Sequence, residues 1–376
     1  MNRIYLDNAA TTPLDPQVME AMLPYLSTHF GNPSSVYSYG RETRLAVENA
    51  RKTVARLVKA QPGEIFFTSG GTESDNMALV AAVEDLGCRH FITSAIEHHA
   101  VVHTVEHLQK KYSLQVSYVS VTPHGHIDLD HLQALVAGSS ERVLVSLMHA
   151  NNEIGNLLDI EKVGAICKAH QAIFHSDTVQ TLGHYPLDFS KKWIHFATGA
   201  SHKFHGPKGV GLLYVSNELT IQPMIHGGGQ ERNMRAGTEN IYGIVGFAKA
   251  LELADEHGER DRAHILSLKY YLAERLQQQI PGLVFNGDWN GESLYTVLNV
   301  SFPRNEKTEM LLMALDMQGI CVSGGSACSS GADLGSHVIR ALRSTPGVPI
   351  RFSFSKYNTQ EQLDRVLQVL AQLVSS

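Results

Sequence analysis

Val143-Leu144-Val145-Ser146-Leu147-Met148, the segment Ile160 to His170 and Ile173-Phe174-His175-Ser176 decide the fold. The first and last are short apolar runs rich in β-branched and aromatic residues, a pattern that predicts strands. The middle segment places apolar residues at i, i+3, i+4 spacing, which predicts a helix. A strand, a helix and a second strand in this order indicate parallel strands joined by a crossover helix.

The same alternation continues on both sides of this unit. Further apolar runs are Ile65 to Thr68, Phe91 to Thr93, Val116 to Val119 and Gly211 to Val215, and further helical patterns are Thr72 to Ala82 and Val101 to Lys110. We therefore predict a mainly parallel α/β sheet covered on both faces. In such sheets ligands bind at loops beyond the carboxyl ends of the strands.

The pattern changes after about Gly246. A long charged helical segment is followed by short strands and helices, which predicts a smaller α+β domain. These segments are Phe247 to Gln279, Thr296 to Phe302, Thr308 to Gln318, Gly319 to Val322, Pro349 to Ser355 and Thr359 to Leu373. Thr359 and Gln362 have the spacing of a capping box at the start of the last helix. We expect a large domain of residues 15–255 and a small domain of residues 1–14 and 256–376.

Composition excludes several classes of protein. The 376 residues are 43% hydrophobic and carry a net charge of −6, without a run of five basic residues or an apolar stretch of about 18. We therefore expect no binding to nucleic acid and no membrane span. The start, Met1 to Asp7, lacks the apolar region of a signal peptide. Four cysteines without a CxxC motif indicate free thiols in a reducing compartment, so a cytoplasmic location is expected; they are Cys88, Cys167, Cys321 and Cys328.

Three polar motifs follow predicted strands. Ser69-Gly70-Gly71-Thr72-Glu73-Ser74 can cradle an anion at a helix N-terminus, or can simply be a capped turn. Asp177 ends a strand, where it can hold a protonated heterocyclic nitrogen or cap a helix. Lys203 lies in a Gly- and His-rich turn that suits an amine nucleophile, although a lone lysine is usually a solvated surface residue. Together, an anion cradle, an acid and a lysine are the parts that pyridoxal phosphate requires.

With these motifs, the chain resembles the cysteine desulfurases of the class V aminotransferase group, which are fold type I pyridoxal-phosphate enzymes. The resemblance covers nearly the whole chain. Its landmarks are Tyr5 to Pro13, Gly31 to Ser35, Ser69 to Asn76, Glu97 to Ala100, His149 to Gly155, His226 to Arg232, Arg235 to Thr238, and the segments around Asp177, Lys203 and Cys328. It implies a large domain with a mainly parallel seven-stranded sheet and a small α+β domain.

The resemblance also implies roles for individual residues. Lys203 would form the Schiff base with the cofactor, His98 would stack on its ring and help to move protons, and Cys328 would be the sulfur-accepting nucleophile. Asp177 would hold the ring nitrogen and Gln180 the phenolic oxygen. The phosphate would be bound by Gly71, Thr72 and His202, with Thr238 from a neighbouring subunit. Asn152, at the cofactor, and Arg351 would hold the substrate carboxylate.

The chain departs from the family pattern at one position. The family usually has Ser-Gly-His-Lys or Ser-Ala-His-Lys, whose serine contacts the phosphate, but here that position is Ala200 and a serine stands at 201. Either Ser201 or Thr198 would substitute, or the phosphate has one ligand fewer. Cofactor binding is expected to survive, because the other donors remain.

Cys328 lies in the Gly- and Ser-rich segment Ser323 to Gly331, which is too small and polar for a core. An exposed thiol there suits a nucleophile that must reach a substrate and then deliver its cargo. We therefore expect conversion of L-cysteine to L-alanine with the sulfur held as a persulfide on Cys328, for transfer to an acceptor such as an iron–sulfur scaffold protein. Homodimerisation is implied by the family.

Other activities remain open from the sequence. A selenocysteine lyase or a class V aminotransferase would use the same cofactor frame, and a sulfur-scaffold protein without catalysis would keep only the binding surfaces. No metal site is expected: His99, His103 and His107 share a helical face, but no His-Glu-x-x-His motif is present, and stacking on the cofactor accounts better for His98.

Overall fold

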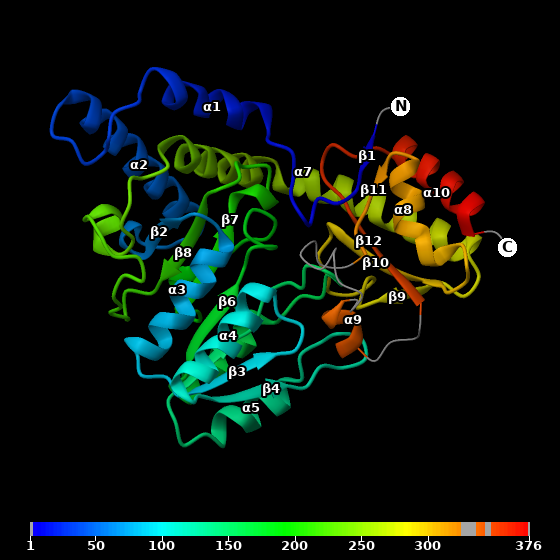
Figure 1. The fold of residues 1–376 in the computed structure, drawn as a ribbon, viewed down its shortest axis with the longest axis horizontal. Helices are drawn as coiled ribbons and strands as arrows, with labels where there is room; N and C mark the ends of the chain where they lie inside the picture. The colour runs from blue at the N-terminus through cyan, green and yellow to red at the C-terminus, as the bar shows by residue number, and fades with distance from the viewer. Residues whose placement is uncertain (1–2, 325–335, 343–346, 375–376) are drawn as a thin grey trace.

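The computed structural model describes residues 3–324, 336–342 and 347–374. Its larger lobe is built on a seven-stranded sheet with the order β2-β8-β7-β6-β5-β3-β4 (Figure 1). The strands are β2 (Ile65–Thr68), β3 (His90–Ser94), β4 (Gln115–Val119), β5 (Val143–Ser146), β6 (Ile173–Asp177), β7 (Phe196–Ala200) and β8 (Gly211–Val215). From β7 through β6, β5 and β3 to β4, each strand pairs in parallel with the next. Strand β8 runs antiparallel to both β7 and β2. The predicted mainly parallel sheet is confirmed.

Helices cover both faces of this sheet because alternate strand residues point to opposite sides. On β2 and β8, Phe66 and Leu213 pack into the core beneath α3 (Gly71–Glu84) and α4 (His99–Tyr112). Phe67 and Leu212 belong to the core on the other face. That second face is covered by α1 (Pro16–Ser27), α2 (Ser38–Leu57), α5 (Leu129–Ala137), α6 (Ile160–Ala169) and the first part of α7.

Helix α7 (Ile241–Gln279) joins the two lobes without a break over 39 residues and crosses Figure 1 from one lobe to the other. Its first half, up to Leu253, packs into the core of the large lobe, and its second half, from Ile265, packs into a separate core. It begins six residues before the predicted Phe247, because the side chain of Asn240 caps it by accepting a hydrogen bond from the Gly243 N–H.

The smaller lobe contains an antiparallel sheet of order β12-β10-β9. Its elements are β9 (Val284–Asn286), β10 (Val297–Pro303), α8 (Leu311–Met317), β11 (Ile320–Cys321), α9 (His337–Ala341), β12 (Gly347–Ser353) and α10 (Gln360–Val374). The capping box at α10 is confirmed: Thr359 Oγ1 accepts from the Gln362 N–H at 3.4 Å, and Gln362 Oε1 accepts from the Thr359 N–H at 3.3 Å.

The N-terminal segment belongs to both lobes. Strand β1 (Ile4–Tyr5) pairs in parallel with β11, and Asp7 bridges Ser353 of β12. The following residues cross to the large lobe, where the Thr12 N–H donates to His202 O at 2.9 Å. The segment therefore carries residues of the small lobe's edge directly to the carboxyl ends of β6 and β7. Among the described residues, no helix combines the length and hydropathy that crossing a bilayer requires.

Candidate active site

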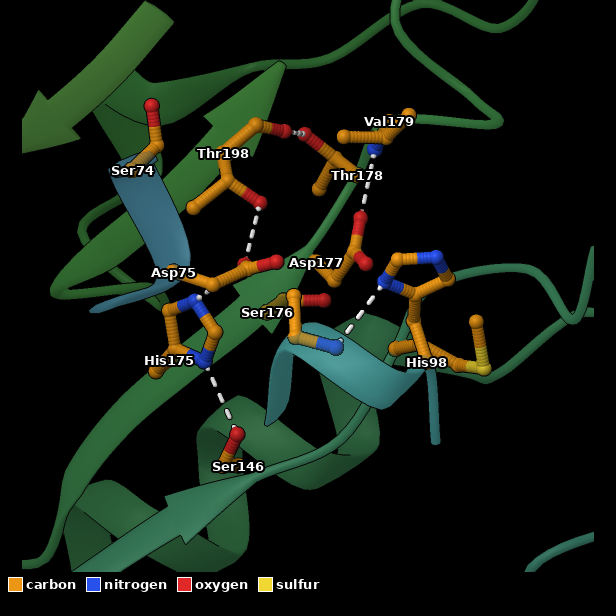
Figure 2. A network of polar contacts seen from close by, with 12 residues as sticks. Ser74, Asp75, His98, Ser146, His175, Ser176, Asp177, Thr178, Val179 and Thr198 are labelled. Carbon is orange, nitrogen blue, oxygen red and sulfur yellow. Dashed lines mark hydrogen bonds and ion pairs between the residues drawn. The ribbon is translucent and has the colours of Figure 1, made fainter. Parts of the chain in front are cut away.

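Asp177 ends β6 at the carboxyl edge of the large sheet, where parallel strands place ligand-binding groups. Its side chain is 6% exposed, and Oδ1 accepts a hydrogen bond from the Val179 N–H at 2.9 Å (Figure 2). Burial raises the pKa of Asp177, and the charge of a second buried carboxyl, Asp75, raises it further. A cationic group beside Asp177 would counter both effects.

Lys203 follows β7 in a single 3-10 turn, Ser201–Lys203. Its Nζ donates to Ala9 O at 2.6 Å and to Ala10 O at 2.8 Å. These carbonyls belong to the N-terminal segment, so two distant parts of the chain hold the amine in place. The sequence predicted the lysine but gave no sign of these two partners, since backbone carbonyls have no sequence signature.

The first turn of α3 lies next to this amine. Gly71 packs so closely on Val179 that an added Cβ would come within 2.7 Å of a methyl carbon of that valine. Glycine thus lets the helix N-terminus, with its unpaired N–H groups, approach the turn after Asp177. Thr72 and His202 line the same space, and His202 Nδ1 lies 3.1 Å from Thr11 Oγ1. Burial, Lys203 and Lys208 lower the pKa of His202 to about 4, so its imidazole is neutral at pH 7.

His98 precedes α4 and caps it, because Nδ1 accepts from the Ala100 N–H at 3.1 Å. This contact leaves Nε2 as the ring nitrogen available to a ligand. Burial lowers the pKa of His98, Lys203 lowers it further and Asp177 opposes both. Figure 2 shows His98 beside the Asp177 carboxylate.

Arg351 enters from β12 of the small lobe and is 1% exposed. Nη1 donates to Asn152 O at 2.9 Å and Nη2 donates to Asp7 Oδ1 at 2.7 Å. Within the described residues, Nε is buried without a hydrogen-bond acceptor. A buried cation with an unused donor is a site for an anion such as a carboxylate.

These groups surround one cavity of about 250 Å³. It is lined by Ala9, Ala10, Gly71, Thr72, Asp75, His98, Met148, Asn152, Asp177, Val179, Gln180, Ala200, His202, Lys203 and Arg351. Gln180 takes its place through a bond from Nε2 to Ala9 O at 3.1 Å. The structure thus brings together most of the residues that the sequence analysis proposed.

Among the described residues, three that the sequence analysis proposed do not line the cavity: Ser201, Thr198 and Thr238. Ser201 is fully buried, and its hydroxyl donates to Pro207 O rather than into the cavity. Thr198, the other candidate to replace the missing serine, donates to Asp75 Oδ1 at 2.9 Å. Because both hydroxyls are used in these bonds, we assign neither as a phosphate ligand. Thr238 is exposed on the surface, and Cys328 lies outside the described residues.

Sequence reasoning missed two buried acids, Asp75 and Glu97. Burial raises the pKa of Asp75 to about 7 and that of Glu97 to about 8. One potential ligand atom each of Asp75, His98 and Asp177 lie within 4.8 Å of one another. These three side chains line the cavity already described, and the absence of a metal stays a prediction. An acid inside the apolar pattern of α3 was the available signal for Asp75.

Comparison with known proteins places the chain in a family. The model for class-V aminotransferases matches residues 4–366. A relative from Dictyoglomus turgidum named cysteine desulfurase IscS is 42% identical over 99% of this chain and 94% of its own length. A solved NifS-like protein superposes with a TM-score of 0.91 at 38% identity, covering 99% of both chains. A solved structure described as SspA in complex with cysteine has a TM-score of 0.81 at 30% identity, over 95% of this chain and all of its own. The predicted fold and family are confirmed: the chain belongs to the class-V aminotransferases.

Proposed function

We propose that the protein is a pyridoxal-phosphate-dependent cysteine desulfurase. L-Cysteine and the Cys328 thiol would give L-alanine and a Cys328 persulfide, so that one C–S bond breaks and one S–S bond forms. The observation that carries the proposal is that Lys203, Asp177 and Arg351 face one cavity from three separate parts of the fold. The full-length relatives named cysteine desulfurase support this reaction over transamination.

The donor set in the cavity fits pyridoxal phosphate. The open first turn of α3 and the neutral His202 supply hydrogen-bond donors for a phosphate. The buried Asp177 needs a cationic partner, which a protonated ring nitrogen provides. Lys203 would hold the aldehyde and Gln180 the ring oxygen. When bound, this cofactor supplies an electron sink that stabilises negative charge on the substrate's α-carbon.

Lys203 Nζ would move the proton at the α-carbon once substrate has taken its place on the cofactor. Its two carbonyl acceptors, on Ala9 and Ala10, keep the amine beside the cavity. His98 would lie against the ring, because its Nδ1 is fixed by accepting the Ala100 N–H. Its lowered pKa favours the neutral imidazole, whose hydrogen is then on Nε2 and can be donated into the cavity. Burial of these groups excludes water that would compete for the proton.

Arg351 and Asn152 would bind the substrate carboxylate. Asp7 and the Asn152 carbonyl fix the plane of the guanidinium, which leaves Nε available as a donor. Fixing the guanidinium before binding lowers the entropic cost of holding substrate.

Described residues on both sides of the stretch 325–335, which contains Cys328, are bonded near this substrate site. On one side, Ser323 and Arg351 exchange backbone hydrogen bonds, of 2.7 and 3.2 Å. On the other, Ser336 Oγ donates to Glu153 Oε2 at 2.5 Å, one residue after Asn152. Both anchors therefore support the proposal that Cys328 receives the substrate's sulfur.

We propose a homodimer in which Thr238 reaches the neighbouring subunit's cofactor. Large apolar side chains are exposed together on and after α1 and at the start of α2: Met19, Leu23, Leu26, Phe30, Val36, Tyr37 and Tyr39. Such patches mark interaction surfaces. Gln230 connects this surface to the Thr238 segment, since it contacts Ser34 Oγ at 3.4 Å and accepts from the Gly237 N–H at 3.1 Å.

The sulfur acceptor would be a second protein, such as an iron–sulfur scaffold, and the location would be the cytoplasm. A persulfide is kept only where thiols are not oxidised to disulfides. Of the cysteines described, Cys88, Cys167 and Cys321 are free, as a reducing compartment requires.

The test is an assay of alanine and protein-bound persulfide formed from L-cysteine. Wild type should form both, Cys328→Ser should form neither in the first turnover, and Cys321→Ser is the matched control that should form both. Lys203→Ala should lose the visible absorbance of cofactor-loaded protein, while Lys191→Ala should keep it. Keto-acid-dependent amino transfer without sulfur release would instead identify an aminotransferase, and turnover restricted to selenocysteine would identify a selenocysteine lyase.

A further inference from the structure

We propose that Asp75, at the wall of the cavity, and His175 share one proton, and that this neutral pair leaves Asp177 as the carboxylate that carries the site's negative charge. Asp75 and His175 are then positioning residues that act through Asp177. The inference rests on the proposed function, because the charge on Asp177 matters for a ring nitrogen bound beside it.

The pair lies in a hydrogen-bonded chain that crosses the sheet from α3 to β5 (Figure 2). His175 Nε2 lies 3.3 Å from Asp75 Oδ1, and His175 Nδ1 lies 2.8 Å from Ser146 Oγ. Thr198 Oγ1 donates to the same Asp75 oxygen at 2.9 Å. The side chains of His175 and Asp75 are 0% and 1% exposed, so water does not mediate these contacts from the surface.

The contacts of His175 leave room for one proton between its Nε2 and Asp75 Oδ1. Ser146 engages Nδ1, which leaves Nε2 as the nitrogen that faces Asp75. Among the described residues, no group forms a regular hydrogen bond with Nε2. If the neutral imidazole donates from Nδ1 to Ser146 Oγ, Nε2 needs a donor, and a protonated Asp75 supplies one. One proton thereby gives the buried His175 Nε2 the hydrogen-bond partner that it otherwise lacks.

Electrostatics favours this neutral form over an ion pair. Burial lowers the pKa of His175 to about 4, so its imidazole is neutral at pH 7, and raises the pKa of Asp75 to about 7, so Asp75 keeps its proton to a much higher pH than an exposed aspartate does. Asp177, which has the Val179 N–H and nearby histidines, has a pKa of about 6. Asp177 is therefore the first carboxyl of the group to ionise.

The other titratable groups around Asp177 favour the same placement of the negative charge. Burial raises the pKa of Glu97, before α4, to about 8, so it too is mainly neutral at pH 7. His98 faces the cavity, and its positive charge, when it is protonated, lowers the pKa of Asp177. If Asp75 were ionised as well, two carboxylates would lie within 4.8 Å of His98 and of each other in a buried site, and their repulsion would weaken the hold on a ring nitrogen's proton.

The first experiment uses the cofactor-free protein and infrared spectroscopy, so it does not depend on catalysis. A protonated carboxylic acid has a C=O band that ionised carboxylates lack and that shifts in D₂O. We expect Asp75→Asn to remove part of this band at pH 6.5, Glu97→Gln to remove another part, and Asp130→Asn, an exposed control, to remove none. An unchanged band in folded Asp75→Asn protein overturns the inference.

A second variant keeps the inference testable if Asp75→Asn does not fold. Thr198→Val removes a hydroxyl that favours the ionised form of Asp75, at nearly constant volume. The acid band of Asp75 should then persist to higher pH than in wild type. No shift in Thr198→Val would contradict a proton on Asp75.

The third measurement follows the visible absorbance of cofactor-loaded protein against pH. Because asparagine imitates a protonated aspartic acid, Asp75→Asn should leave the midpoint of this titration nearly in place, whereas Asp177→Asn should move it. A shift of about one pH unit or more in Asp75→Asn, a tenfold change in proton affinity, means that Asp75 is charged and the inference is wrong. If loaded wild type shows no visible band, the proposed function fails, and the infrared result still decides the state of Asp75.

Discussion

Arg351 Nη2 lies 2.7 Å from Asp7 Oδ1, so the guanidinium that we propose to bind substrate is fixed by the N-terminal segment of the same chain. That segment goes on to hold Lys203 through the carbonyls of Ala9 and Ala10. The cation proposed for the substrate and the amine proposed for the cofactor are thus positioned by neighbouring residues. Movement of this segment would disturb both groups at once.

The ion pair with Asp7 predicts an effect on substrate binding. Asp7→Asn should raise KM for cysteine about tenfold, since a charge-assisted hydrogen bond contributes ~1.5–3 kcal/mol, with a smaller effect on kcat. Arg351→Lys should raise KM further, because an ammonium cannot replace the planar fork. Steady-state kinetics measure both, with the exposed Arg304→Lys as control. Unchanged KM in Asp7→Asn would show that Arg351 needs no such support.

The positions of Ala200 and Ser201 predict that only a change at Ala200 alters cofactor affinity. Ser201→Ala should leave cofactor affinity unchanged but lower the free energy of unfolding by about 1 kcal/mol, because it removes the buried bond to Pro207 O. Ala200→Ser should tighten cofactor binding several-fold, since Ala200 lines the cavity. Absorbance titration of cofactor-free protein and urea unfolding separate the two effects. Weaker cofactor binding in Ser201→Ala would return Ser201 to the phosphate site.

A buried ion pair anchors the segment proposed to reach the partner subunit. Glu231 accepts from Arg51 Nη1 at 2.7 Å, from Nη2 at 2.8 Å and from the Phe67 N–H at 2.8 Å. Glu231→Ala should lower the free energy of unfolding by about 3–5 kcal/mol, because it leaves Arg51 buried without its main partner. Arg232 is the next residue and is exposed. Arg232→Ala should therefore lower the free energy of unfolding much less, as measured in the same denaturant titration. Comparable losses in both would contradict a specific role for the pair.

The contacts of Asp15 predict part of the stability change in acid. Burial alone would raise the pKa of Asp15, but hydrogen bonds from Lys356, Tyr357 and the Gln17 N–H outweigh it and hold the pKa below its ordinary value. Asp15 therefore stabilises the fold above its unfolded pKa of about 4, and this stabilisation is lost as the pH falls through the lower folded value.

Asp15→Asn should accordingly flatten the fall of unfolding free energy in the pH range below about 4, at a cost of about 1 kcal/mol near neutrality. Urea unfolding measured at several pH values tests this, with the exposed Asp130→Asn as control. Identical acid dependence in Asp15→Asn and wild type would mean that Asp15 is not depressed in the folded state.

The sequence determined the large sheet, the family and most of the cavity's residues. Period-2 and period-3.6 patterns are local, so the strand Ile173–Asp177 and helix Ile160–Ala169 could be predicted from short windows of sequence. The same holds for the capping box of Thr359 and Gln362, because its partners are three residues apart. Asp177 and Lys203 stood out because each follows a strand at the edge where parallel sheets bind ligands.

Only the tertiary structure decided which partners these residues have. The bonds of Lys203 to Ala9 and Ala10, of Arg351 to Asp7, and of Thr198 to Asp75 join positions more than 100 residues apart. No local pattern encodes such pairs, since they arise when separate strands and the N-terminal segment meet at one edge of the sheet. The proton proposed between Asp75 and His175 has the same origin: burial, which sets their charge, exists only once the sheet and α3 have packed together.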